Sequence, residues 1–302
     1  MPSCRCALLA ASSSRAALDA ISVLQDGRAA GATTIARKRS VFTNVIGYAV
    51  ELEEMPANPL EHLSWKPPKV SEVVDRRVVV NPRQARELLT AVTYVGQQRR
   101  GPLARGQRLM ALYACLYFAA LRPAEAVGLR IQDCYLPETG WGRLTLEKSR
   151  PEVNRRWTDT GSAHDERGLK HRAADETRTV PIPPELVAIL RTHISTFGVA
   201  PDGRIFSSER GHAVASTAIS DVWAEARTLA FTPAQVVSPL AGRPYDLRHA
   251  GVSLWLAAGV PAPRVAARAG HSVEVLLRVY AKCLDDGETI ANARIDAALR
   301  DS

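Results

Sequence analysis

A proline-rich stretch divides the 302-residue chain into two unequal parts. Pro56, Pro59 and the run Lys66-Pro67-Pro68-Lys69 separate two regions in which apolar residues recur at helical spacing. Prolines at this density interrupt helices and strands, because each removes a backbone donor and restricts the residue before it. We therefore predict one domain over residues 1–68 and a second over residues 69–302.

Helical patterns dominate both parts. In the first, apolar residues between Thr33 and Leu52 form one stripe of an amphipathic helix. In the second, Asn81-Pro82 is typical of an N-cap followed by proline at the first helical position, and it opens a helix to about Val95. Further helices are predicted over residues 107–120, 184–195, 217–229, 245–258, 262–268, 273–284 and 288–300.

Only two segments alternate with the period of a strand, residues 143–147 and 177–182. A long polar excursion, residues 149–176, separates them, and we expect one further strand within it. The fold class is therefore predicted to be mainly α with a small antiparallel sheet.

The charge of the chain favours a nucleic-acid partner. Lys and Arg number 39 against 31 Asp and Glu, a formal net charge of +8, and only six of the 39 are lysines. Arginine is always charged, and its planar fork suits phosphate oxygens. A GC-rich genome is the plain alternative explanation for so many arginines.

Several classes of protein are excluded or disfavoured. No apolar run approaches the roughly 18 residues of a membrane span. The five cysteines form neither a disulfide scaffold nor a pair with zinc-ligand spacing. The apolar run Cys6 to Ala11 is too short for a secretory signal. We expect a reduced, cytoplasmic protein with no metal and no membrane partner.

Four short patches carry side chains that suit phosphate chemistry. Arg122 and Glu125 are spaced i, i+3 at a helix start, so they share one face. Lys170 stands near the turn of the predicted hairpin. The third patch, Pro244-Tyr245-Asp246-Leu247-Arg248-His249, opens an apolar helix. Taken singly, these patches are typical of a surface ion pair, a solvated lysine and a core tyrosine.

The fourth patch is Ala269-Gly270-His271-Ser272, with Tyr280 nine residues after His271. In one continuous helix these two side chains would lie on opposite faces, roughly 13 Å apart. Gly270 favours a break, and Ser272 is a suitable cap for a new helix. With that break, His271 and Tyr280 are able to meet at one site.

Together, the patches resemble the active-site series of the tyrosine recombinases, the phage-integrase family. The matching series is Arg122, Lys170, Tyr245-x-x-Arg248, Gly270-His271 and Tyr280, and the flanking sequences of residues 120–125, 246–249 and 269–272 also fit. The resemblance covers roughly residues 80–285 and is closest to the actinobacterial mobile-element integrases. One residue departs from the pattern, since Tyr245 stands where the family usually has histidine.

The resemblance implies a site-specific DNA recombinase that needs neither metal nor cofactor. Tyr280 would attack the scissile phosphate and form a 3′-phosphotyrosyl link. Arg122 and Arg248 would clamp the non-bridging oxygens, and Lys170 would protonate the departing 5′ oxygen. Two further residues, His271 and Tyr245, would donate hydrogen bonds to the phosphate. Glu125 would orient the site, and His249 is interpreted as structural.

The resemblance also implies a helical core-binding domain ahead of the catalytic domain. Residues 33–66 resemble only the last part of such a domain, so residues 1–68 are interpreted as a partial one. Within it, Arg37, Lys38 and Arg39 are predicted to contact DNA, although a solvated charge run is an equal alternative.

Two other functions stay open, and a third is discounted. The chain could be a truncated, catalytically decayed remnant of a mobile element that still binds DNA. A type IB topoisomerase shares the nucleophile and the basic residues. A metal-dependent nuclease needs clustered carboxylates, for which Asp285-Asp286 is the nearest candidate, and it is disfavoured.

Double-stranded DNA is the partner implied first. Recombination in the family needs two sites and four protomers, so we expect a homotetramer on paired sites, with a directionality factor as a further partner. The helix predicted over residues 288–300 would be exchanged with a neighbouring protomer or packed on its own domain.

Overall fold

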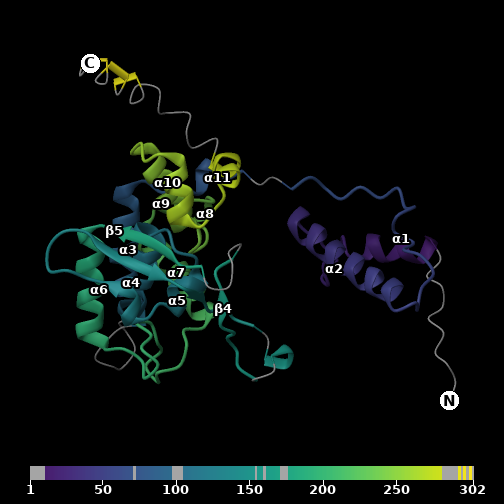
Figure 1. Cartoon of the computed structure of the whole chain (residues 1–302), viewed down its shortest axis with the longest axis horizontal. Helices are drawn as coiled ribbons and strands as arrows, with labels where there is room; N and C mark the ends of the chain where they lie inside the picture. Colours follow the sequence, from purple (N-terminus) through teal and green to yellow (C-terminus); the bar gives the residue numbers. More distant parts are fainter. Residues whose placement is uncertain are drawn as a thin grey trace. The chain divides into compact units, whose positions relative to one another are not determined.

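A computed structural model describes residues 11–70, 73–96, 105–153, 155–158, 161–170 and 176–280, together with the short stretches 292–293, 295–296 and 299–300. Two compact units make up the chain, Met1–Glu72 and Val73–Ser302 (Figure 1). Each unit is described by itself.

The described part of the smaller unit contains two helices that share a small core. Helix α1 covers Ala11–Ala20 and helix α2 covers Ala32–Glu51. Leu18 of α1 and Ile46 of α2 are buried against Met55 and Leu60. The last two come from the proline-rich stretch, which therefore contributes to the core of the smaller unit as well as separating the two parts of the chain. Two helices alone offer too little apolar surface, and the chain that follows them completes the core.

The larger unit is mainly helical. Its helices are α3 (Pro82–Tyr94), α4 (Arg105–Phe118), α5 (Pro123–Gly128), α6 (Pro184–Phe197), α7 (Ser216–Ala230), α8 (Pro233–Val237), α9 (Asp246–Ala257), α10 (Ala262–Ala269) and α11 (Val273–Tyr280). Short 3₁₀ turns, η1 (Arg76–Val78), η2 (Ile131–Asp133) and η3 (Arg155–Trp157), occur between them. No helix in the described residues is long and apolar enough to cross a bilayer.

Helix α4 is the centre of the larger unit. Nearly every residue from Leu109 to Phe118 is buried, so the helix is apolar all round, as expected of an element enclosed on every side. It packs against α3, α6 and α9. The contact with α9 is very close, because a Cβ atom added to Gly251 would lie 2.1 Å from the carbonyl oxygen of Tyr117.

A three-stranded antiparallel sheet covers part of this helical core. Its order is β1 (Cys134–Tyr135), β2 (Gly142–Leu146) and β5 (Arg178–Ile182), and Leu146 pairs with Arg178. The chain between β2 and β5 forms a second, two-stranded ladder from β3 (Lys148–Ser149) and β4 (Arg167–Gly168). This ladder leads directly to Lys170.

The fold class predicted from the sequence is confirmed. The predicted helix at Asn81-Pro82 has a complete capping box, in which the Asn81 side chain accepts from the Gln84 N–H at 2.9 Å and the Gln84 side chain accepts in return. The short helix α8 and strand β1 were not predicted, since both are too short to show a period. Most of the helix predicted over 288–300 lies outside the described residues.

We predict that Gly251→Ala lowers the free energy of unfolding by about 1–3 kcal/mol, because α4 and α9 must separate to admit the methyl group. Gly47→Ala in α2 is the matched control, since nothing lies within 4 Å of its added Cβ. The control should be neutral or stabilising by up to about 1 kcal/mol. Urea unfolding of both variants measures the difference, and equal stability would show that the close contact is not required.

Candidate active site

Four of the predicted catalytic residues line one cavity of about 540 Å³, namely Arg122, Lys170, Tyr245 and His271. They come from four places in the chain: the start of α5, the loop after β4, the start of α9 and the junction of α10 and α11. Lys170 is exposed, whereas Tyr245 and His271 are half-buried. The fold therefore gathers residues that are up to 149 positions apart in the sequence around one space.

The predicted helix break between His271 and Tyr280 is present. Gly270 ends α10 in the left-handed conformation with φ +68°. Ser272 then caps α11, because its hydroxyl accepts from the Val275 N–H at 3.2 Å. His271 consequently lies between the two helices, and the centroids of the His271 and Tyr280 rings are 6.2 Å apart.

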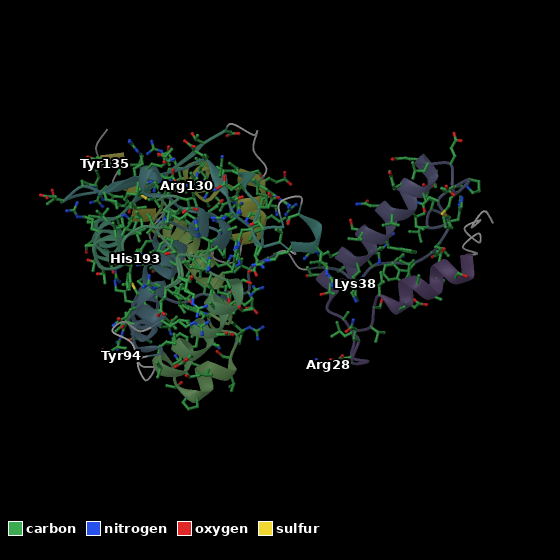
Figure 2. The ribbon with its side chains drawn as sticks, turned by 90° about the horizontal axis from the view of Figure 1, so that it is seen from below. Arg28, Lys38, Tyr94, Arg130, Tyr135 and His193 are labelled. Carbon is green, nitrogen blue, oxygen red and sulfur yellow. The ribbon has the colours of Figure 1, made fainter. Side chains whose placement is uncertain are left out.

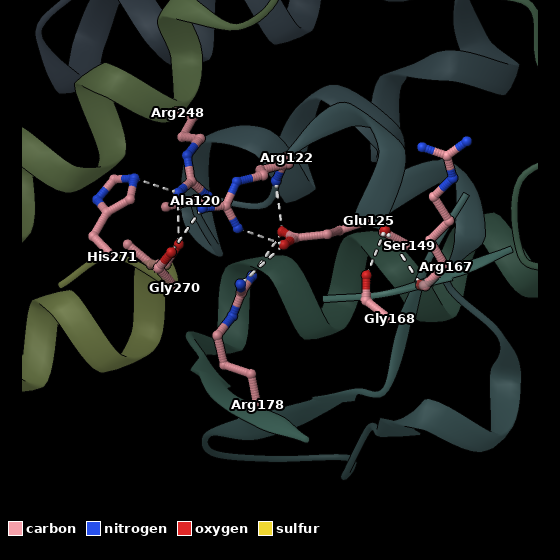
Figure 3. A network of polar contacts seen from close by, with 11 residues as sticks. Ala120, Arg122, Glu125, Ser149, Arg167, Gly168, Arg178, Arg248, Gly270 and His271 are labelled. Atoms are coloured by element: carbon pink, nitrogen blue, oxygen red, sulfur yellow. Dashed lines mark hydrogen bonds and ion pairs between the residues drawn. The ribbon is translucent and has the colours of Figure 1, made fainter. Parts of the chain in front are cut away.

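Arg122 is held by contacts on both sides (Figure 3). Its Nη1 donates to Oε1 of Glu125 at 2.8 Å, and its Nη2 donates to the carbonyl oxygen of Gly270 at 2.7 Å. The side chain is 16% exposed and reaches the cavity wall. One arginine therefore ties α5 to the junction of α10 and α11.

Arg178 is a member of this network that sequence reasoning missed. It donates to both oxygens of Glu125, at 2.9 and 2.6 Å, and the two side chains are only 2% and 1% exposed (Figure 3). The Arg122–Glu125 spacing, which taken singly is typical of a surface ion pair, therefore belongs here to a buried network. A signal was available, because the alternation of β5 places Arg178 on the same buried face as Val180 and Ile182.

Gly270 is required for space as well as for its backbone conformation. An added Cβ would lie 2.2 Å from Nη1 of Arg178 and 3.1 Å from Nη1 of Arg122. The two arginines can approach the Gly270 backbone only because no side chain intervenes.

The ion pairs keep Glu125 ionised. Burial by itself raises the pKa of this carboxyl, but the hydrogen bonds and charge of Arg178, followed by the charges of Arg248 and Arg122, outweigh it and lower the pKa to about 2. A permanently ionised Glu125 can therefore accept from both arginines throughout the physiological pH range.

Arg248 lies beneath the cavity and does not line it. It is fully buried, and it donates to the carbonyl oxygens of Ala120 and Ala269. Ala120 presents its carbonyl from a left-handed backbone conformation, φ +47°, which is costly for a residue with a side chain. Burial lowers the pKa of Arg248 below its ordinary value.

The hydrogen bond between Arg248 and His271 fixes the tautomer of that histidine. Arg248 Nη2 lies 2.9 Å from His271 Nε2, and a guanidinium can only donate, so Nε2 accepts. Burial, together with the charges of Arg248, Arg122 and Arg178, lowers the pKa of His271 to about 3, which leaves the ring neutral. The proton of the neutral ring therefore lies on Nδ1, which is buried without a hydrogen-bond partner among the described residues.

Tyr280 is enclosed at the end of α11. The side chain is fully buried, and its Oη lies 2.9 Å from Nδ1 of His249. The Tyr245 ring packs edge-on against His249 with centroids 5.0 Å apart. Tyr280 does not line the cavity, but it adjoins His271, which does.

The three predicted DNA-contacting residues of the smaller unit differ in their exposure and in their contacts. Arg37 is exposed. Lys38, labelled in Figure 2, is half-buried, and its Nζ donates to the carbonyl oxygen of Ile21 at 3.4 Å. Arg39 lies over the Trp65 ring, 5.5 Å from its centroid. Two of the three side chains thus contact their own unit.

No group of three or more His, Cys, Asp or Glu side chains in the described part of the chain could hold a metal ion. The pair Asp285-Asp286, named above as the nearest candidate for a nuclease site, lies outside the described residues.

Solved structures with a similar arrangement of elements include integrases and recombinases bound to DNA. The Tn1549 transposon integrase in complex with transposon right end DNA is 14% identical, with a TM-score of 0.65 over 95% of this chain and 85% of that one. The XerH recombinase bound to its difH substrate is 13% identical, with a TM-score of 0.58 over 89% of this chain and 65% of that one. The lambda integrase bound to DNA is 13% identical, with a TM-score of 0.55 over 91% of this chain and 80% of that one.

The fold is that of a tyrosine recombinase. No protein-family model matches the sequence, and no curated protein sequence matches it either. Because these identities are only 13–14%, the similarity to the solved structures shows a shared fold.

We predict that Glu125 makes the stability of the protein depend on acid pH. Its folded pKa is about 2 against an ordinary value of 4.5, so this stabilisation is complete above about pH 4.5 and is lost as the pH falls toward 2. The ionised Glu125 contributes about 3 kcal/mol in total to the free energy of unfolding, and about 2 kcal/mol of this contribution is lost by pH 3.

Glu125→Gln is the matched variant for this prediction. At neutral pH it should be less stable by about 3–5 kcal/mol, because Arg178 loses its buried carboxylate. The gap between wild type and variant, measured by urea unfolding at pH 6 and pH 3, should shrink by about 2 kcal/mol. A gap of the same size at both pH values would contradict the assignment.

Proposed function

We propose that this chain is a tyrosine-type site-specific DNA recombinase, an integrase of a mobile element. The observation that carries the proposal is the gathering of Arg122, Lys170, Tyr245 and His271 around one cavity, with Arg248 and Tyr280 directly behind it. These six residues are the series that the sequence resemblance implies, and their proximity within a tyrosine-recombinase fold supports the proposal.

The geometry fits the cleavage of a phosphodiester. Arg122 offers a guanidinium at the cavity wall, and Arg248 supplies a second positive charge beneath it. His271 carries its proton on the buried Nδ1, so it can donate a hydrogen bond to a phosphate oxygen once the side chains that cover this atom move. Tyr245 adds a phenol at the same wall, where it can donate in place of the usual histidine.

In this proposal, the reaction is a transesterification at phosphorus. The Tyr280 oxygen attacks the scissile phosphate and forms a 3′-phosphotyrosyl link, and the bond to the 5′ oxygen breaks. Lys170, exposed at the cavity, protonates that leaving oxygen. The bond energy is retained in the phosphotyrosyl link for religation, so no external energy source is consumed.

Double-stranded DNA is the proposed substrate, and a homotetramer on paired sites is the proposed assembly. A directionality factor, a place in the cytoplasm and closeness to actinobacterial integrases belong to the same proposal. They rest on the sequence resemblance, and the solved integrases and recombinases named above were themselves captured with DNA.

A second candidate is a decayed remnant that binds DNA without cutting it. The observation in its favour is the complete burial of both Arg248 and Tyr280, which keeps the nucleophile away from the cavity. The smaller unit also has only two described helices with which to hold DNA.

Covalent trapping on DNA separates the two candidates. The protein is incubated with nicked duplexes that carry the sequences flanking its own gene, and a protease-sensitive adduct is sought on a denaturing gel. We expect an adduct that disappears in Tyr280→Phe, because only the phenol oxygen can form the link. The control Tyr135→Phe, at a side chain 57% exposed on β1, should keep the adduct.

The decayed remnant would give a different result. It would shift the duplexes in a salt-sensitive manner, as phosphate contacts require, without any adduct in the wild type.

A further inference from the structure

His249 has a contact that its interpretation as a structural residue does not explain. Its Nδ1 lies 2.9 Å from the Tyr280 Oη, the atom that would attack phosphorus. The rings are 5.7 Å apart, and Tyr280 is fully buried, so the hydrogen bond is formed away from water. A hydrogen bond to a reacting atom is the first geometric condition for a general base.

The nucleophile needs such a base. An ordinary tyrosine phenol has a pKa near 10, so it is almost entirely protonated at neutral pH and attacks phosphorus poorly. A neutral imidazole within hydrogen-bond distance can take the proton as the new bond forms.

The other two candidates at the site do not meet this condition. The accepting nitrogen of His271 is already occupied, because its Nε2 receives a hydrogen bond from Arg248 at 2.9 Å. Tyr245 carries a phenol instead of an imidazole, so it is no stronger a base than Tyr280 itself. His249 is left with its Nδ1 directed at the phenol oxygen.

We propose that His249 is a further catalytic residue, whose Nδ1 holds the Tyr280 phenol and accepts its proton as the phenol oxygen attacks phosphorus. The inference rests on the function proposed above. The Oη–P bond forms while the P–O5′ bond breaks, the phenol proton moves to His249, and Lys170 gives a proton to the 5′ oxygen. In religation the same steps run in reverse, and His249 returns the proton to the departing phenol.

The electrostatics of the site are consistent with this role. Burial, followed by the charges of Arg248 and Arg243, lowers the pKa of His249 to about 4, so the ring is neutral and its lone pair is available. A phosphodiester anion bound beside Arg122 and Arg248 offsets part of that positive charge. His249 therefore becomes a stronger base when the substrate is present, which is when a base is required.

The test uses His249→Asn in the full-length protein. The amide oxygen of asparagine can still accept from the phenol close to the position of Nδ1, but it cannot take up the proton. We expect the rate of adduct formation to fall about 10²-fold or more, with DNA binding unchanged, and added imidazole to restore part of the rate. The control is His212→Asn at an exposed histidine, which should react like the wild type.

A modified substrate separates the base from the acid. With sulfur in place of the 5′ bridging oxygen, the leaving group departs without protonation. This substrate should rescue Lys170→Ala and leave His249→Asn slow. Rescue of both variants would assign His249 to the leaving-group side and overturn the proposal.

A second measurement does not depend on activity. Nitrogen NMR of the free protein should show His249 protonated on Nε2, with an unprotonated Nδ1 whose shift changes in Tyr280→Phe. A proton on Nδ1 would overturn the proposal.

The kinetic outcomes are equally distinct. An unchanged adduct rate in His249→Asn would overturn the base role, and a faster rate would show that His249 restrains the nucleophile instead. A wild type that forms no adduct would overturn the proposed recombinase function itself, and the role of His249 with it.

Discussion

The buried ion pair between Arg178 and Glu125 is the interaction on which the candidate site depends. It joins strand β5 to helix α5 through two hydrogen bonds, in a region where both side chains are almost completely excluded from water. Glu125 also accepts from Arg122, which in turn donates to the Gly270 carbonyl. Strand β5, helix α5 and the junction of α10 and α11 are therefore linked through one carboxylate and Arg122. Loss of either partner would leave a buried charge without compensation, which is far more costly than the pair itself is stabilising.

The same network leaves the site short of negative charge. Arg122, Arg178 and Arg248 carry three positive charges within it, and Glu125 supplies one negative charge. Arg248 is satisfied by backbone carbonyls, which provide dipoles and no formal charge. An anion in the adjoining cavity would offset this excess, and a phosphodiester has the right charge and the right acceptor oxygens. The electrostatic requirement of the folded protein and the substrate proposed for it thus agree.

Much of this could be predicted from the sequence where a local rule determines the structure. Asn81-Pro82 located the start of α3, and Gly270 with Ser272 located the break that brings His271 beside Tyr280. The prediction failed where only tertiary packing decides. The alternation of β5 indicates a buried face for Arg178, but nothing local identifies its partner, because Glu125 lies 53 residues away. The interpretation of His249 as structural misses its contact with Tyr280. That contact joins two helices, so no spacing along the sequence indicates it.

The burial of Tyr280 has a mechanical consequence for the proposed reaction. A phenol with no exposed surface cannot reach a phosphate in the cavity unless α11 or the side chains covering it move. At its start, α11 is held by the Ser272 cap, next to Gly270 in the left-handed backbone conformation. At its end, the Val279 carbonyl accepts from the Val74 N–H at 2.8 Å, and Val74 is packed in the same small core as Tyr280. Val74 lies at the beginning of the larger unit, directly after the chain that leads from the smaller one. The position of Tyr280 is therefore tied to the first residues of the larger unit.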